Sequence, residues 1–340
     1  MRFIVIAVLL LILASLGSAL YYLVKDQGKT GKVVQMLTLR ISTTAALSPA
    51  VRLNPPSGYV SCTVKHVVYY PADLAQRITE RTRLVWLEAP GSVTMEFPNL
   101  PELVRICRSR GVTCALDNTW GAGLAFAPFD LLGDGALGVD ISVHALTKYP
   151  SGGGDVLMGS IVTRSDELAR VLKLSHMRLG TGVGANDAEM VLRSLASLPL
   201  RYKAQDTAAR TLAAWCTSQP AFSQVLHPAL SSSPGHAHWQ RLCVTQHEPE
   251  GLAAGIFSVV MDERFTSTQV DAFCDALQLF KIGYSWGGPM SLVMPYNMAS
   301  SRVRSVSHRQ RGRVVRFCIG LENVIDLQND MARALKVANL

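Results

Sequence analysis

DISVHALTKYPSGGGDVLMG, residues 140–159, places Lys148 directly after an apolar run and just ahead of three glycines. The apolar run at 139–146 predicts a buried strand. A lysine at the end of such a strand is costly unless it is paired or used covalently. The glycines at 152–154 let the backbone turn close to that lysine. The order differs from a P-loop, in which the lysine follows the glycines.

Apolar runs and helical periodicity alternate on both sides of this stretch. We expect strands over 83–90, 112–118, 139–146 and 154–164, a helix over 99–111 that Gly111 ends, and a short helix or turn over 129–138. Continuous apolar strands joined by helical connections predict an α/β fold with a parallel sheet covered on both faces. Ligands of such sheets bind at the carboxyl ends of the strands.

Three ionisable residues fall at that edge of the predicted sheet. Glu88, Asp117 and Lys148 each stand at or just past the end of an expected strand. Charges at strand ends also occur without any role, so this pattern alone leaves a functional and a purely structural interpretation open. Pyridoxal 5'-phosphate would explain Asp117 and Lys148, because it needs a lysine for its Schiff base and an acid facing its pyridine nitrogen. The hydroxyl of Thr147 would then be available to the phosphate.

The overall composition narrows the class of protein. The chain has 340 residues and a formal net charge of +8, with many arginines in 300–316, but no zinc-finger spacing or RNP-like pattern. We therefore interpret the charge as a solvated basic face and expect no nucleic-acid partner. The seven cysteines form no CxxC pair and indicate core thiols in a reducing compartment. The HAH triplet at 236–238 is interpreted as a surface loop, so no metal site is predicted.

The N-terminus is a different kind of sequence. Residues 3–24 carry no charge and are long enough to span a bilayer as a helix. A cleaved signal peptide is the alternative, although its apolar region is usually shorter. Lys25, Lys29 and Lys32 follow the segment, against Arg2 alone before it, which places the C-terminal side in the cytoplasm. We expect a catalytic domain in the cytoplasm, tethered to the bacterial inner membrane.

The expected domain organisation has four parts. They are a membrane anchor at 1–40, a Pro-rich linker at 41–59, part of a large domain at 60–205 and a small C-terminal domain at 206–340. The first part also resembles the beginning of a family of small two-helix bacterial membrane proteins.

Several ordered motifs resemble one enzyme family. They are LEAPGSVTMEF (87–97), DNTW (117–120), TKY (147–149) with the glycine turn and Asp155 behind it, YSWGGPMSL (284–292) and VVRFCIGLENVIDLQNDMARAL (314–335). Together they resemble the cystathionine-metabolism enzymes, which are fold-type I pyridoxal-phosphate proteins. The Gly-Ser of the first motif is similar to the β-lyase branch. The resemblance covers about residues 60–340 and implies an aminotransferase-like large domain, with a mostly parallel sheet, and a smaller α+β C-terminal domain.

The resemblance also implies roles for single residues. Lys148 would form the Schiff base and transfer the proton, Asp117 would hold the pyridinium nitrogen, and Thr147 would contact the phosphate. Arg316 would clamp the substrate α-carboxylate, assisted by Ser285, with Trp286 beside it; these three are the substrate-binding candidates. Arg316 stands inside VVRFCIGLE (314–322), where the apolar residues around it predict a strand. A bidentate arginine is the expected partner of a carboxylate.

The activity implied is an α,β-elimination that cleaves L-cystathionine to homocysteine, pyruvate and ammonia, a transsulfuration step of methionine biosynthesis. The resemblance further implies a homo-oligomer that acts on a small amino-acid substrate. Residues 1–59 show no match to the family's phosphate loop, stacking tyrosine or N-terminal arm, and SGGGD lacks the histidine usual before its aspartate. The alternative is therefore a catalytically inactive, membrane-tethered remnant that acts at most as an interaction protein.

Overall fold

The computed structural model describes residues 71–297 and 313–340. The chain divides into two units, Met1–His66 and Val67–Leu340, and all described residues belong to the second. The predicted anchor at 3–24 and the linker at 41–59 lie outside the described residues. Among the helices that the structure describes, none is long and apolar enough to cross a membrane.

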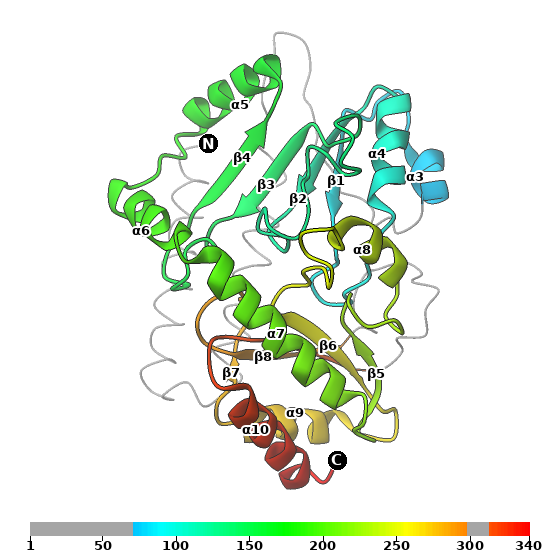
Figure 1. Ribbon diagram of the computed structural model, residues 1–340, viewed down its shortest axis with the longest axis vertical. Coiled ribbons are helices and arrows are strands. Elements are labelled where there is room, and N and C mark those ends of the chain that lie inside the picture. The colour runs from blue at the N-terminus through cyan, green and yellow to red at the C-terminus, as the bar shows by residue number, and fades with distance from the viewer. Residues whose placement is uncertain (1–70, 298–312) are drawn as a thin grey trace, which may run out of the picture. The chain divides into compact units, whose positions relative to one another are not determined.

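A four-stranded sheet, called the first sheet below, forms the upper half of Figure 1. Its order is β1 (Leu84–Glu88), β2 (Thr113–Asp117), β3 (Ile141–Ala145) and β4 (Gly159–Thr163). The first three strands are parallel, as predicted, but β4 runs antiparallel to β3. A parallel neighbour needs a long crossover connection, and the glycine loop between β3 and β4 holds no helix. The sheet is therefore mostly parallel, as the resemblance implies, with β4 as its one antiparallel strand among the described residues.

The predicted helix over 99–111 is present as α4 (Leu100–Ser109), which connects β1 to β2. The Asn99 side chain accepts a hydrogen bond from the backbone of Glu102, and Gly111 follows the helix with a φ of 62°. A shorter helix, α3 (Pro71–Arg77), precedes β1. Residues 129–138 contain no helix and form turns and bends.

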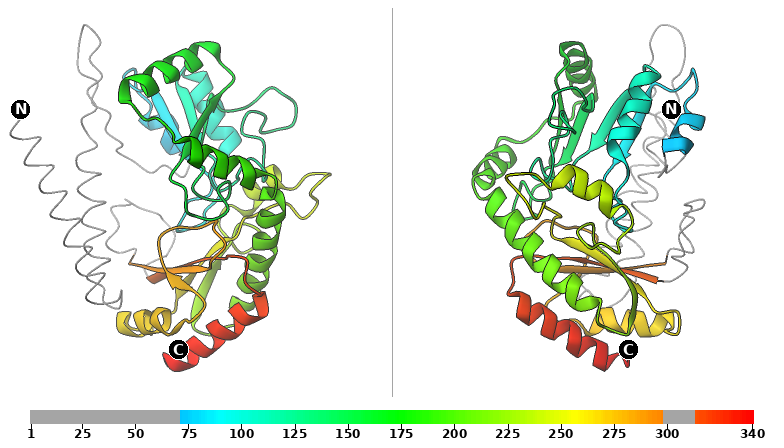
Figure 2. Two further views of the ribbon diagram at one scale, coloured as in Figure 1. Left: turned by 90° about the vertical axis from the view of Figure 1, so that its left-hand side faces the viewer. Right: turned by 45° about the vertical axis from the view of Figure 1, so that its right-hand side comes forward.

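A five-stranded second sheet lies below the first in Figure 1. Its order is β5 (Phe222–Leu226), β6 (Ile256–Met261), β9 (Arg313–Cys318), β8 (Leu292–Asn297) and β7 (Lys281–Ile282), antiparallel except for β7 beside β8. Helices α7 (Leu198–Cys216), α9 (Ser267–Ala276) and α10 (Val324–Val337) complete this half. Figures 1 and 2 show α9 and α10 on the side of this sheet that faces away from the first sheet.

Strand β9 divides its side chains between the two faces of the second sheet. Val315 and Phe317 belong to the apolar cluster that includes residues of α9 and α10, whereas Val314 and Cys318 belong to the cluster shared with the first sheet. Since side chains alternate along a strand, Arg316 lies on the same face as Val314 and Cys318, toward the first sheet. The strand predicted around Arg316 is thus confirmed.

The first sheet is not covered on both faces by described residues. The edge strand β1 exposes 53% of Trp86, and the edge strand β4 exposes 57% of Ile161. Helix α5 (Asp166–Leu179) lies beside β4 and has no buried residue, and α6 (Ala185–Leu195) buries only Val191. The prediction of a sheet buried on both sides therefore fails at its two edges.

Two further outcomes concern the small domain. The boundary predicted between 205 and 206 falls inside α7, which runs without interruption through Leu198–Cys216. The HAH triplet is not a loop: His236–Cys243 form helix α8, and Nδ1 of His236 lies 2.9 Å from the carbonyl oxygen of Pro228. Gly235 precedes the helix with a φ of 80°, so the Pro-Gly pair turns the chain directly into it.

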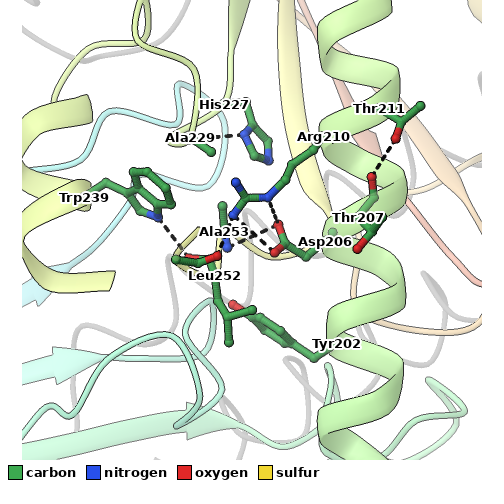
Figure 3. A network of polar contacts seen from close by, with 12 residues as sticks. Tyr202, Asp206, Thr207, Arg210, Thr211, His227, Ala229, Trp239, Leu252 and Ala253 are labelled. Carbon is green, nitrogen blue, oxygen red and sulfur yellow. Dashed lines mark hydrogen bonds and ion pairs between the residues drawn. The ribbon is translucent and has the colours of Figure 1, made fainter. Parts of the chain in front are cut away.

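An ion pair between the buried Asp206 and the partly buried Arg210 braces α7 against the loop that leads into β6 (Figure 3). Nε of Arg210 donates to Oδ1 of Asp206 at 2.9 Å, and Nη2 donates to the carbonyl of Gly251 at 2.8 Å. Oδ1 of Asp206 also accepts from the backbone of Ala253, and the Arg210 guanidinium faces the ring of Trp239 at 5.5 Å. These contacts satisfy most of the polar atoms of the pair, which a buried ion pair requires.

The ion pair of Asp206 and Arg210 predicts that the stability of the fold depends on pH. Burial raises the pKa of Asp206 from 3.8 to about 6, against the opposing effect of Arg210. The folded protein therefore holds the Asp206 proton more tightly than the unfolded chain does. The contribution of protonated Asp206 to the free energy of unfolding is complete below pH 3.8 and is lost as pH rises through about 6. We expect the unfolding free energy of the wild type, relative to that of Asp206→Asn, to fall across this interval. Urea denaturation at a series of pH values measures it, and parallel pH profiles would contradict the prediction.

Candidate active site

The carboxyl ends of β1, β2 and β3 meet at the edge of the first sheet that faces the second sheet. Glu88 and Asp117 are register partners on β1 and β2. Oδ1 of Asp117 accepts from the backbone of Thr119 at 3.0 Å and from its hydroxyl at 2.5 Å, and that hydroxyl accepts from the backbone of Ala145. The Asp117 carboxylate is thus fixed to both β2 and β3. Within residues 71–297 and 313–340, no side chain or backbone donor bonds to its other oxygen.

Lys148 is half-buried just past the end of β3, and a loop of the second sheet reaches it. Nζ of Lys148 donates to Oγ of Ser285 at 3.0 Å and lies 5.4 Å from the ring centre of Trp286. Burial lowers the pKa of Lys148, and the cation of Arg316 acts in the same direction. The structure therefore brings together three of the predicted site residues and favours the neutral amine that proton transfer needs.

The residue after Lys148 fixes its position. Tyr149 is fully buried, its ring packs edge-on against Trp286 at 5.6 Å and Tyr202 at 4.7 Å, and its hydroxyl accepts from the backbone of Gly255 at 2.8 Å. Nη1 of Arg201, at the start of α7, donates to the carbonyl of Tyr149 at 2.8 Å. Sequence reasoning did not single out Arg201, because no motif marks it. Its partners become adjacent only when α7 packs beside the lysine loop.

Gly287 lets the loop of the second sheet come this close. Its φ is 77°, and a Cβ there would lie 2.8 Å from the backbone nitrogen of Tyr149 and 3.2 Å from the carbonyl carbon of Lys148. Only a glycine combines this left-handed conformation with so close an approach. The neighbouring Gly288 is different, because its Cβ would meet nothing nearer than 3.9 Å.

Arg316 is 4% exposed, and its guanidinium points to backbone oxygens rather than to an acid. Nη1 donates to the carbonyl of Ser92 at 3.2 Å and Nη2 to the carbonyl of Tyr284 at 2.5 Å. Nε is buried and has no hydrogen-bond partner, and no described carboxylate forms an ion pair with this side chain. A buried, unpaired guanidinium is costly, so the geometry suits an anionic ligand.

Thr147 closes the loop that follows β3. Its hydroxyl accepts from the backbone of Met158 at 3.2 Å and lies 3.4 Å from the carbonyl of the same residue. The hydroxyl ties the two ends of the glycine-rich turn together. Its contact with a phosphate stays a prediction.

The donor set matches what the aldehyde and the pyridine nitrogen of pyridoxal phosphate require of a protein. Lys148 supplies a primary amine whose pKa is lowered, and Asp117 supplies a carboxylate with one oxygen that no described donor uses. Arg316 lies on the facing sheet as a buried cation. Among the described residues no cluster of His, Cys, Asp or Glu could hold a metal ion. The residues present therefore fit this cofactor.

Fold and site together define a pyridoxal-phosphate enzyme of the α/β class. Residues 57–336 match the family described as Cys/Met metabolism PLP-dependent enzyme, and the chain belongs to this family, whose cofactor is pyridoxal phosphate. Residues 1–56 match a second family, described as a protein of unknown function (DUF2909).

Curated relatives and a solved structure agree with this assignment. The chain is 35% identical to a putative cystathionine beta-lyase of Rhizobium johnstonii, covering 80% of this chain and 67% of the relative. It is 34% identical to the cystathionine beta-lyase of Bordetella avium, covering 78% and 63%. The crystal structure of metB from Corynebacterium glutamicum superposes with a TM-score of 0.68 at 25% identity, covering 79% of this chain and 66% of that one. The chain thus spans about two thirds of the length of these proteins.

The two adjacent glycines provide a matched test of the site. Gly287→Ala should strain the backbone by about 1–2 kcal/mol and push the loop away from Lys148, because its Cβ meets main-chain atoms. Gly288→Ala should be tolerated. Borohydride trapping of pyridoxal phosphate on Lys148, followed by peptide mapping, should fall strongly in the first variant and stay near the wild-type level in the second. Equal trapping in both variants would show that the approach of Gly287 does not matter.

Proposed function

We propose that this protein is a carbon–sulfur β-lyase that cleaves L-cystathionine by α,β-elimination. The observation that supports it best is the environment of Lys148. Its amine has a lowered pKa, donates a hydrogen bond to Ser285 and faces the ring of Trp286. The cation of Arg316, which pairs with no described carboxylate, acts on the same amine. An α-amino acid suits such a site, because the amine can transfer its Cα proton and the cation can bind its α-carboxylate. The β-lyase names of the relatives supply the choice of substrate and bond.

When bound, pyridoxal phosphate supplies an electron sink for the charge that develops at the substrate Cα. Asp117 would hold the ring nitrogen in its protonated form, because a fixed carboxylate facing that nitrogen favours the cation. Thr119 keeps that carboxylate in place through two hydrogen bonds to Oδ1. Thr147 is expected to contact the phosphate.

Lys148 removes the proton from the substrate Cα. An amine does this only in its neutral form, and burial lowers the pKa of Lys148, which is the direction that favours this form. Ser285 accepts a hydrogen bond from Nζ and so orients the amine toward the substrate. The pair of electrons left at Cα then expels the sulfur from Cβ, and homocysteine leaves after its sulfur gains a proton.

Arg316 fixes the substrate by its α-carboxylate, and Trp286 covers one side of the reacting amine. The three-carbon product that remains after the loss of sulfur hydrolyses to pyruvate and ammonia. We further propose a homo-oligomer, and a tether to the inner membrane through residues 3–24 with the catalytic domain in the cytoplasm.

Absorbance of the purified full chain tests cofactor binding first. Adding pyridoxal phosphate should produce a visible band, and borohydride should fix the label on the peptide that contains Lys148. The variant Lys148→Ala removes the amine and should lack both the band and the label. Absence of the band in a folded wild-type protein would favour the alternative, an inactive membrane-tethered remnant.

Arg316→Gln tests the carboxylate site. The variant loses hydrogen bonds to the substrate carboxylate, and such bonds to a charged group contribute about 1.5–3 kcal/mol. We therefore expect kcat/KM for L-cystathionine to fall about 10- to 100-fold, mainly through a higher KM. Pyruvate release, coupled to lactate dehydrogenase, measures the rate. Arg264→Gln, an exposed arginine that bonds to the carbonyl of Pro220, serves as the control and should behave as wild type. Unchanged KM in Arg316→Gln would remove Arg316 from the site.

A further inference from the structure

Tyr296 covers the guanidinium of Arg316. Cζ of Arg316 lies 5.3 Å from the centre of the Tyr296 ring. On the second sheet Tyr296 of β8 is the register partner of Val314 on β9. Arg316 stands two residues further along β9, so the two side chains form a diagonal cross-strand pair on one face. At this distance the guanidinium is attracted to the face of the aromatic ring.

A second tyrosine contacts the same ring. Tyr284 packs edge-on against Tyr296 with ring centres 6.2 Å apart, and the Tyr284 carbonyl accepts from Nη2 of Arg316. The carbonyl of Ser92 accepts a hydrogen bond from Nη1 of Arg316. The guanidinium is therefore restrained by hydrogen bonds to two carbonyls and by a cation–π contact with the Tyr296 ring. No motif in the sequence marks Tyr296, because its partner lies on a separate strand.

We propose that Tyr296 is a substrate-positioning residue that fixes the plane of Arg316 for the α-carboxylate of the substrate. The inference rests on the proposed role of Arg316 and adds the residue that holds it. A carboxylate bonds to a guanidinium best through two parallel hydrogen bonds, which demands a fixed plane. A ring that restrains this plane sets the affinity for a carboxylate-bearing ligand, and it leaves the chemistry at Lys148 unchanged.

The ring acts as a neutral aromatic partner. Burial raises the pKa of Tyr296 to about 12, so its hydroxyl keeps its proton at physiological pH and supplies no countercharge. Tyr296→Phe keeps the aromatic face and should therefore retain carboxylate affinity. Tyr296→Leu and Tyr296→Met remove that face. A cation–π contact of this kind corresponds to about threefold to tenfold in affinity.

The experiment compares two ligands that differ only in the carboxylate, L-alanine and L-alaninamide. Both are titrated into the full chain with pyridoxal phosphate present, and binding is measured by isothermal titration calorimetry, which reports on every variant, Arg316→Gln included. The leucine and methionine variants should bind L-alanine about threefold to tenfold more weakly, with unchanged affinity for the amide. KM for L-cystathionine should rise by the same factor at constant kcat.

Phe280→Leu is the matched structural control. Phe280 packs against Phe317 of β9 with ring centres 5.3 Å apart, on the face of the strand opposite Arg316. Losing that ring should lower the melting temperature without changing the affinity ratio of the two ligands. The methionine variant covers the case in which the leucine variant does not fold.

The outcomes separate this inference from the proposed function. If Arg316→Gln loses affinity for L-alanine and the Tyr296 variants do not, Tyr296 has no positioning role and the proposed function stands. Equal weakening of L-alanine and L-alaninamide would also overturn the inference, since it would indicate a general disturbance of the site. If L-alanine binds Arg316→Gln as well as wild type, the carboxylate site itself is wrong and the inference fails with it.

Discussion

The hydrogen bond from Lys148 to Ser285 joins two residues that are 137 positions apart in the chain, and the rest of the site depends on it. It exists only because the loop after β7 of the second sheet reaches the end of β3 in the first. Gly287 permits the approach by keeping a side chain out of the main-chain contact with Tyr149. Neither sheet holds the amine alone, so the active site is a product of how the two sheets pack.

Two arginines, Arg210 partly buried and Arg316 buried, illustrate how charge is handled in the described part of the chain. Arg210 is paired with Asp206 through Nε and Nη2, and Nη2 also donates to a backbone carbonyl. Arg316 has backbone carbonyls and an aromatic ring but no described acid. The first arrangement is complete and braces the fold. The second leaves a cation without a countercharge, which favours binding of an anion when a ligand arrives. The difference between the two surroundings singles out Arg316 as the candidate for binding a carboxylate, without reference to any motif.

The sequence predicted those features that depend on local pattern. The apolar runs located β1, β2 and β3, and the polar residues at their ends placed Asp117 and Lys148 at one edge of a sheet. Arg316 was correctly placed on a strand because apolar residues surround it. The antiparallel direction of β4 was missed, because pattern gives a strand but not its direction. Arg201 and Tyr296 were missed because their importance comes from partners that only tertiary packing brings near, Tyr149 in one case and Arg316 in the other.

The exposed edges of the first sheet and the chemistry of the site lie in different places. Trp86 of β1 and Ile161 of β4 are at the outer edges of the sheet, whereas Asp117 stands on an inner strand and Lys148 follows another. The contacts that orient Lys148 come from Ser285, Trp286 and the Tyr149–Arg201 pair, all within the described residues. Exposed apolar edge strands lower solubility, because their unpaired backbone groups can pair with strands of other chains. The geometry around the lysine is fixed by the second sheet and by α7, and is therefore largely independent of what covers those edges.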